Sequence, residues 1–189
     1  MDAGLVRVWD VDSNELVFES RPSPGRIRAV TFSDTGRCLT WGCGDGTVRA
    51  WEPATDRESE RLGDTGGWVR SIALDPAARY IGVGTGSGEI QVWDRATATL
   101  CCRLVGHSGR VLSLAFAPGL DRLISAAADG TIRLWSLTDG SELCQLRVDA
   151  SLLTCVADAS RGRVLLATPH HVTLVRLHDA SQGPSIDAG

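Results

Sequence analysis

Four glycines at alternate positions are the first group of residues whose type and spacing could indicate a binding site. Gly82, Gly84, Gly86 and Gly88 superficially suggest a loop that cradles a phosphate group. Their spacing fits neither the G-x-G-x-x-G fingerprint nor the P-loop, and no helical pattern follows to supply the positive end of a helix dipole. A glycine-rich turn between two strands explains them better than a phosphate site does.

The histidines and cysteines could act as metal ligands, bases or nucleophiles. His170 and His171 are adjacent, and adjacent side chains on a strand point to opposite faces, so they would not converge on one ion. The six cysteines show neither C-x-x-C spacing nor a metal-ligand pattern with the four histidines. No serine or cysteine lies in a nucleophile-elbow context. We therefore predict no catalytic residue, no metal and no cofactor.

Charge and composition argue against two further classes of function. Of the 189 residues, 43% are apolar and 22% are charged, which is ordinary for a globular protein. The net charge of −4 gives no basic footprint for nucleic acid. Uncharged stretches are short, so no membrane span is expected, and the N-terminus has no signal-peptide pattern. We expect a cytoplasmic protein with free thiols.

The chain is organised by a repeat of 42 residues. Tryptophan recurs at this spacing as Trp9, Trp51, Trp93 and Trp135, and the next step reaches Leu177. Three glycines and three turns keep the same spacing, namely Gly25, Gly67 and Gly109, and residues 44–47, 86–89 and 128–131. Several features that share one period indicate an array of equivalent structural units.

Each unit has the pattern of strands rather than helices. Its apolar segments are short, rich in Val, Ile, Leu, Thr and Trp, and separated by turn residues. Asp45-Gly46 and Asp129-Gly130 are strong hairpin signals, because tight hairpin turns need positive φ. The sequence therefore predicts an all-β fold built from units of four strands.

The stretch that runs from Gly106 to Trp135 resembles a near-consensus WD repeat. This resemblance implies a β-propeller of four-stranded antiparallel blades. It also implies a buried hydrogen-bonded network of His107, Ser125, Asp129 and Trp135, with Trp9, Trp51, Trp93 and Trp135 as blade-end tryptophans. Asp129 and His107 are thus expected to be structural, not catalytic.

The other repeats depart from that pattern. The position of His107 holds Ser23 and Thr65, that of Ser125 holds Trp41 and Val83, and that of Asp129 holds Asp45 and Ser87. The last repeat has His171 and Leu177 at the Asp and Trp positions. We expect the polar network to be complete in one blade only, and the others to depend more on apolar packing.

The repeat register predicts a propeller segment over residues 1–177. It contains a partial blade at 5–20, three blades at about 27–62, 69–104 and 111–147, an incomplete last blade at 153–177 and a polar, disordered tail at 178–189. WD propellers usually close with about seven blades, whereas 189/42 gives 4.5 units. We expect an open arc or part of a larger ring. We expect the chain to be the C-terminal part of a longer protein. The alternatives are that two copies associate to close a ring, or that the chain forms an open arc or small propeller by itself.

We expect a partner-binding site at the mouth of the central channel, in the loops that precede the innermost strands. Equivalent positions there hold Arg26, Trp68, Arg110 and Leu152, and two residues further Arg28, Arg70, Leu112 and Thr154. Arginine binds carboxylates bidentately and tryptophan supplies apolar area, so we predict that Arg26, Arg28, Trp68, Arg70 and Arg110 bind a partner. The alternative is that these arginines are solvated and Trp68 packs on its own loop.

We interpret the chain as a non-catalytic protein–protein interaction scaffold that binds a protein or peptide, within a larger protein such as a bacterial signalling protein. The alternative is a propeller-based enzyme with its active site at the channel mouth. That alternative needs histidines and carboxylates at the mouth, where the sequence supplies arginine and apolar groups instead.

Overall fold

The computed structural model describes residues 4–23, 25–59, 65–117, 121–148, 154–158, 163–167, 172–177 and 186–188. These residues form eighteen strands in five separate antiparallel sheets, joined by turns and loops. The described residues contain no helix of the length and apolarity that crossing a membrane requires. The expectation of an all-β fold of four-stranded antiparallel blades is confirmed.

The N-terminal sheet is a two-stranded hairpin of β1 (Arg7–Trp9) and β2 (Leu16–Glu19). Three four-stranded sheets follow, each with its strands in sequence order. The first has β3 (Ile27–Phe32), β4 (Leu39–Cys43), β5 (Val48–Glu52) and β6 (Arg57–Ser59). The second has β7 (Val69–Leu74), β8 (Tyr80–Thr85), β9 (Ile90–Asp94) and β10 (Thr99–Leu104). The third has β11 (Val111–Ala117), β12 (Arg122–Ala127), β13 (Thr131–Ser136) and β14 (Glu142–Arg147).

The last sheet differs from the sequence-based expectation. It contains β15 (Thr154–Asp158), β16 (Arg163–Ala167), β17 (Val172–Leu177) and β18 (Ile186–Ala188). The fourth strand comes from the stretch that was expected to be a disordered tail. It pairs antiparallel with the end of β17, so hydrogen-bonding groups at that strand's outer edge gain partners. His171 lies outside the described residues.

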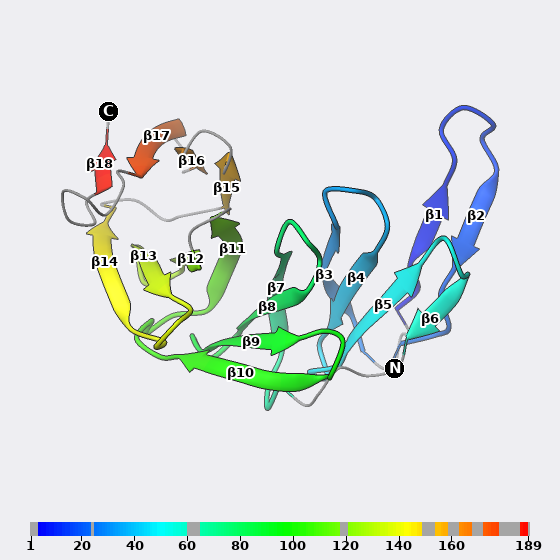
Figure 1. The fold of residues 1–189 in the computed structure, drawn as a ribbon, viewed down its shortest axis with the longest axis horizontal. Helices are drawn as coiled ribbons and strands as arrows, with labels where there is room; N and C mark the ends of the chain where they lie inside the picture. The colour runs from blue at the N-terminus through cyan, green and yellow to red at the C-terminus, as the bar shows by residue number, and fades with distance from the viewer. Residues whose placement is uncertain are drawn as a thin grey trace.

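The sheets succeed one another along an open arc, with the N-terminal hairpin at one end and the C-terminal sheet at the other (Figure 1). The first strands of successive four-stranded sheets are neighbours, so β3 contacts β7, β7 contacts β11 and β11 contacts β15. The fourth strands β6, β10 and β14 lie on the outer side of the arc. The five sheets do not close into a ring among the described residues.

Apolar side chains fill the space between one sheet and the next. The largest such cluster combines Val92 and Leu104 of the second sheet with Val111, Phe116 and Trp135 of the third. Small residues on the second strands permit this close approach. A methyl group on Gly84 would lie 2.6 Å from Cγ1 of Val111, which is closer than packed carbon atoms come. The core is therefore a series of apolar layers, and each layer is formed by side chains from two adjacent sheets.

Candidate functional site

A β-bulge recurs at the second residue of the innermost strands β3, β7 and β11, whereas β15 pairs in regular register. In β3 the register shifts between Ile27 and Ala29, and β7 and β11 show the same shift at the equivalent positions. The extra residues are Arg28, Arg70 and Leu112. A bulge leaves its extra residue out of the ladder and redirects its side chain. Two of the predicted partner-binding arginines therefore occupy bulges, a feature that the residue types alone did not reveal.

The residues before these strands are held through their backbones. The carbonyl groups of Arg26, Trp68 and Arg110 accept hydrogen bonds from Gly44, Gly86 and Ala128 at 2.8, 3.0 and 2.9 Å. These donors belong to the turns that follow the second strands. Each of these three residues is thus anchored at the same edge of its sheet, and all three are exposed. We call Arg26, Arg28, Trp68, Arg70 and Arg110 the inner-rim residues.

Two inner-rim residues from neighbouring sheets are in contact. The guanidinium carbon of Arg28 lies 5.3 Å from the centre of the Trp68 ring, within the range of a cation–π interaction. A methyl group on Gly86 would lie 3.8 Å from Cε3 of Trp68, so the indole also rests beside the following turn. The Trp68 side chain nevertheless stays accessible, because the residue is 63% exposed.

The inner-rim arginines are among the described arginines that lack an ion-pair partner. No described carboxylate forms an ion pair with Arg26, Arg28, Arg70 or Arg110. Away from the inner rim, six arginines pair with carboxylates, namely Arg7–Glu19, Arg49–Glu58, Arg79–Asp94, Arg95–Glu52, Arg103–Glu89 and Arg133–Glu142. Arg21, Arg37, Arg57, Arg122 and Arg147 have no such partner among the described carboxylates. Positive charge is therefore left uncompensated along one edge of the sheets.

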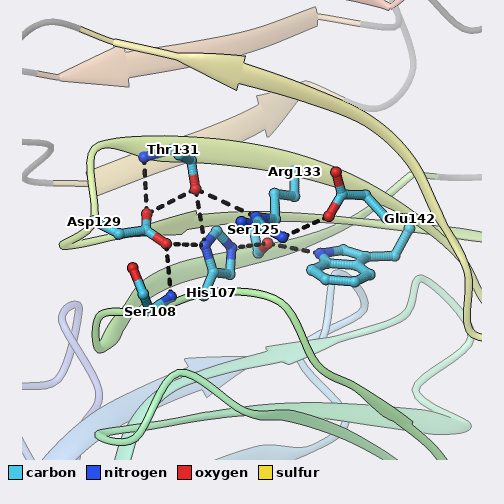
Figure 2. Close-up of polar contacts among 8 residues, drawn as sticks. His107, Ser108, Ser125, Asp129, Thr131, Arg133 and Glu142 are labelled. Carbon is cyan, nitrogen blue, oxygen red and sulfur yellow. Dashed lines mark hydrogen bonds and ion pairs between the residues drawn. The ribbon is translucent and has the colours of Figure 1, made fainter.

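The predicted polar network is assembled in the third sheet (Figure 2). Nδ1 of His107 lies 3.0 Å from Oδ2 of Asp129, and Nε2 lies 2.7 Å from Oγ of Ser125. Because a carboxylate only accepts, Nδ1–H donates to Asp129 and the Ser125 hydroxyl donates to Nε2. The Ser125 oxygen also accepts from Nε1–H of Trp135 at 2.8 Å. All four residues named from the WD resemblance thus form one chain of hydrogen bonds.

Thr131 belongs to the same network, although the sequence analysis did not name it. Its hydroxyl donates to Oδ1 of Asp129 at 2.7 Å and lies 3.0 Å from Nδ1 of His107. Thr47 makes the equivalent hydroxyl bond to Asp45 at 2.7 Å. The repeated Asp-Gly-Thr sequence was therefore a signal that could have identified this role.

The protonation states of the network follow from its surroundings. Burial lowers the pKa of His107 below its ordinary 6.5, against the opposing hydrogen bond to Asp129, so the ring is neutral at neutral pH. For Asp129, burial acts to raise the pKa, but hydrogen bonds from Thr131, from His107 and from the backbone of Ser108 outweigh it and lower the pKa to about 2. Asp129 is therefore ionised at neutral pH.

The order carboxylate–imidazole–hydroxyl is also that of a hydrolytic triad. Ser125, however, is 0% exposed and the His107 side chain is 0% exposed. The Ser125 oxygen is further occupied by the indole of Trp135. A nucleophile needs access to a substrate carbonyl, so this arrangement acts as a structural support that joins the loop before β11 to β12 and β13.

In the sheets that begin with β3 and β7, other residues provide the hydrogen-bond partners of the tryptophan ring nitrogens. In the first, Nε1 of Trp41 donates to Ser23 at 3.4 Å, and Nε1 of Trp51 donates to Asp56 at 3.0 Å. In the second, Nε1 of Trp93 donates to Gln91 at 3.1 Å, and the Gln91 amide donates to the Thr65 carbonyl at 3.1 Å. Among the described residues, every buried side-chain nitrogen or oxygen atom has a partner.

The blade-end tryptophans are not equally buried. Trp51 and Trp135 are 3% and 1% exposed, and Trp93 is half-buried. Trp9, in the two-stranded hairpin, is 54% exposed. Its partner strand β2 nevertheless reaches the first sheet, where the Phe18 ring stacks on Trp51 with centroids 4.3 Å apart.

Metal-binding and nucleophilic groups do not gather elsewhere in the described part of the chain. The His, Cys, Asp and Glu residues described there form no group of three or more suited to an ion. Cys38 and Cys43 are buried, Cys102 and Cys144 are half-buried and Cys101 is exposed. Burial raises the pKa of Cys102, which disfavours its reactive thiolate form.

Comparison with known proteins agrees with this geometry. Residues 15–52 and 98–136 match the family model described as "WD domain, G-beta repeat". The first match begins beside β2 of the two-stranded hairpin and ends at β5, and the second begins beside β10 and ends at β13. The second match includes the His107 network. A search of curated proteins finds no match.

Two solved structures share the fold at low sequence identity. The computationally designed Ika8 protein superposes with a TM-score of 0.77 and 22% identity, over 92% of this chain and 52% of that one. The structure of U3-55K superposes with a TM-score of 0.72 and 17% identity, over 85% of this chain and 51% of that one. The chain spans about half the length of either structure. Together with the sheet order and the His107 network, the two family-model matches identify WD repeats in this chain, and WD repeats indicate a propeller of the protein-interaction scaffold kind.

Proposed function

We propose that this chain is a non-catalytic interaction module that binds an acidic peptide segment of a partner protein through its inner-rim residues. The observation that carries the proposal is the set of inner-rim arginines without described carboxylate partners, next to the exposed Trp68. Arginine recognises carboxylates through paired N–H donors, and an exposed indole buries apolar area on contact.

The spacing of the inner-rim residues suits an extended peptide. They lie in, or directly before, three successive innermost strands that are neighbours in space, so they follow one edge of the arc. The bulges at Arg28 and Arg70 remove these residues from the regular ladder; Arg28 is exposed and Arg70 is half-buried. A peptide with carboxylates and one apolar side chain would match both kinds of contact.

The composition of this edge also supports a non-catalytic role. General acid–base or nucleophilic chemistry needs converging groups with matched pKa values. The described inner-rim residues supply guanidinium groups and an indole, whereas the His107 and Asp129 side chains are buried in the sheet. An enzyme active site at this edge would lack an acid, a base or a nucleophile among those residues.

The test uses an array of synthetic peptides of random sequence, each probed with the purified chain. We expect binding to be enriched for Asp, Glu and apolar residues and to weaken with added salt. Trp68→Ala and Arg70→Gln should each weaken binding of a selected peptide at least about tenfold, the typical effect of a hot-spot residue. Arg37→Gln is the matched control, because Arg37 is an exposed arginine in the turn between β3 and β4.

Melting temperatures of the same variants separate binding from folding. Trp68 is 63% exposed, so its removal should leave the melting temperature nearly unchanged. Unaltered peptide binding by both inner-rim variants, or no enrichment of acidic peptides, would contradict the proposal.

A further inference from the structure

A cavity of about 430 Å³ lies where the sheet of β7–β10 meets the sheet of β11–β14. Asp75 and Tyr80 line it from the first of these sheets, and Phe116 and Asp121 line it from the second. Asp75 directly follows β7, whereas the inner-rim residue Trp68 precedes that strand. The cavity is therefore at the opposite edge of the sheets from the inner rim, and its volume is that of a ligand-binding pocket.

The repeat shows what occupies the equivalent place at the preceding junction, between the sheets of β3–β6 and β7–β10. Arg95, which follows β9, reaches back from its own sheet to the preceding one. Its Nη1 lies 2.7 Å from Oε1 of Glu52 and 3.5 Å from Sγ of Cys38, and its Nε donates to the Ala78 carbonyl at 2.8 Å. The side chain is only 28% exposed. A guanidinium group of the chain itself is thus held between these two sheets.

One repeat later, a leucine replaces this arginine. Leu137 occupies the position of Arg95 and Tyr80 occupies that of Cys38, and both residues line the cavity. Leucine is shorter than arginine and has no hydrogen-bond donor on its side chain. Leu137 packs against the apolar cluster that includes Phe116. The cavity therefore coincides with the place that a guanidinium group takes at the preceding junction.

The cavity retains acceptors for a cation. Its charged lining residues are two carboxylates, Asp75 and Asp121, and one guanidinium group, that of Arg122. Backbone amides of Ala77 and Tyr80 donate to the Asp75 carboxylate and fix its orientation. A carboxylate can accept about four hydrogen bonds, so Asp75 has capacity left. No described cation forms an ion pair with either aspartate.

The acceptors differ from those of Arg95 at one position. Glu52 corresponds to Asp94, which already accepts from Nε of Arg79 at 3.2 Å. An incoming cation must therefore use the two lining aspartates instead. Apolar surface is available beside them, because Phe116 and the aliphatic side chain of Leu137 also line the cavity.

We propose that this cavity binds an arginine side chain of a partner protein. The guanidinium group pairs with the carboxylates of Asp75 and Asp121, and the methylene groups of the same side chain pack on Phe116 and Leu137. Arginine fits better than lysine, because its planar group presents paired donors to carboxylates. This site is independent of the inner rim, where the proposed ligand is acidic.

The test uses an array of acetylated and amidated nonapeptides, each with one central arginine among uncharged residues of random sequence. The array is probed with the purified chain. Each peptide that binds is made again with citrulline at the centre, which keeps the shape of arginine without its charge. We expect this replacement to weaken binding at least about tenfold, as loss of a hot-spot contact does.

Variants of the chain locate the bound arginine. Leu137→Arg places at this junction the residue type that fills the preceding one, so it should weaken peptide binding at least about tenfold. Asp121→Asn should also weaken binding, at least about fivefold, because one carboxylate is lost. Asp34→Asn is the matched control, since Asp34 is an exposed aspartate in the turn between β3 and β4. Neither this control nor Trp68→Ala should change binding of these peptides.

Melting temperatures show whether each variant is folded. If Leu137→Arg does not fold, the citrulline peptides and Asp121→Asn still decide, because Asp121 is exposed and its substitution should leave the fold intact. Equal binding of arginine and citrulline peptides, unchanged binding by the folded variants, or no binding across the array would overturn the proposal. Loss of binding in Trp68→Ala would assign these peptides to the inner rim and overturn it as well.

Discussion

The hydroxyl of Ser125 donates to Nε2 of His107 across 2.7 Å, and this bond joins the second strand of the third sheet to the loop before its first strand. The same oxygen accepts from Trp135, so one hydroxyl satisfies two buried ring nitrogens. A buried polar group without a partner keeps its full desolvation cost. The bond is therefore worth more to stability than an isolated exposed one.

Ser125→Ala should lower the free energy of unfolding by about 1–3 kcal/mol, because Nε2 of His107 and Nε1 of Trp135 would lose their partner. Urea denaturation measures the change. Ser141→Ala is the matched control, since Ser141 is exposed and donates to Asp139 in a surface turn. It should change stability by less than about 0.5 kcal/mol. Equal effects of the two substitutions would show that the buried network contributes no more to the free energy of unfolding than a surface turn does.

Acidification should destabilise the chain in two stages. The folded pKa of His107 lies below 6.5, so the unfolded chain binds more protons below that pH and stability falls as the pH drops. The folded pKa of Asp129 is about 2, compared with 3.8 ordinarily. This difference stabilises the fold by roughly 2 kcal/mol at neutral pH, and the contribution is lost as the pH falls from 3.8 toward 2.

Urea midpoints measured between pH 7 and pH 2 would test both stages. His107→Gln should flatten the upper stage, because the titrating ring is gone. A pH dependence below 6.5 that is the same with and without His107 would contradict the assignment.

Gly84→Ala should destabilise the chain although it adds only one methyl group. That methyl would lie 2.6 Å from Cγ1 of Val111 and would overlap the Ser71 hydroxyl, which donates to the Val111 carbonyl at 3.1 Å between the two sheets. Overpacking of this kind costs about 1–3 kcal/mol. Gly67→Ala is the control, because a methyl there meets no atom within 4 Å and the backbone does not require positive φ. Comparable thermal shifts for the two variants would argue against tight packing between the sheets.

The ion pair between Arg95 and Glu52 should contribute little by itself, although it connects the first and second sheets. Nη1 of Arg95 lies 2.7 Å from Oε1 of Glu52, and the two side chains are 28% and 39% exposed. A double-mutant cycle should give a coupling below about 1 kcal/mol. Arg95→Ala alone should cost more than Glu52→Gln, because Arg95 also donates to the Ala78 carbonyl at 2.8 Å.

The exposed pair Arg7–Glu19 provides the comparison for that cycle. It lies within the N-terminal hairpin, with side chains 54% and 43% exposed. Its coupling should be no larger than that of Arg95 and Glu52. A coupling well above 1 kcal/mol at either pair would show that these surface charges contribute more than solvent screening permits.

The sequence by itself determined the repeat and its chemistry. The spacing of Trp51, Trp93 and Trp135 defined the strand register, and the residues from Gly106 to Trp135 indicated the polar network that His107 and Ser125 form. Such features are readable because they are local, or because a fixed period relates positions that play the same role. The role of Thr131 could also have been predicted from the sequence, because the Asp-Gly-Thr turn is repeated.

Only the tertiary structure decided how neighbouring sheets meet. Trp41 had no expected polar role, yet its indole bonds to Ser23, and Arg28 lies over Trp68 of the next sheet. The exposure of Val30 differs from that of Leu114 although both occupy one repeat position, because burial depends on whether a second strand lies beside them. The strand β18 was likewise missed, since so short a segment gains its stability from pairing with β17 rather than from its own pattern.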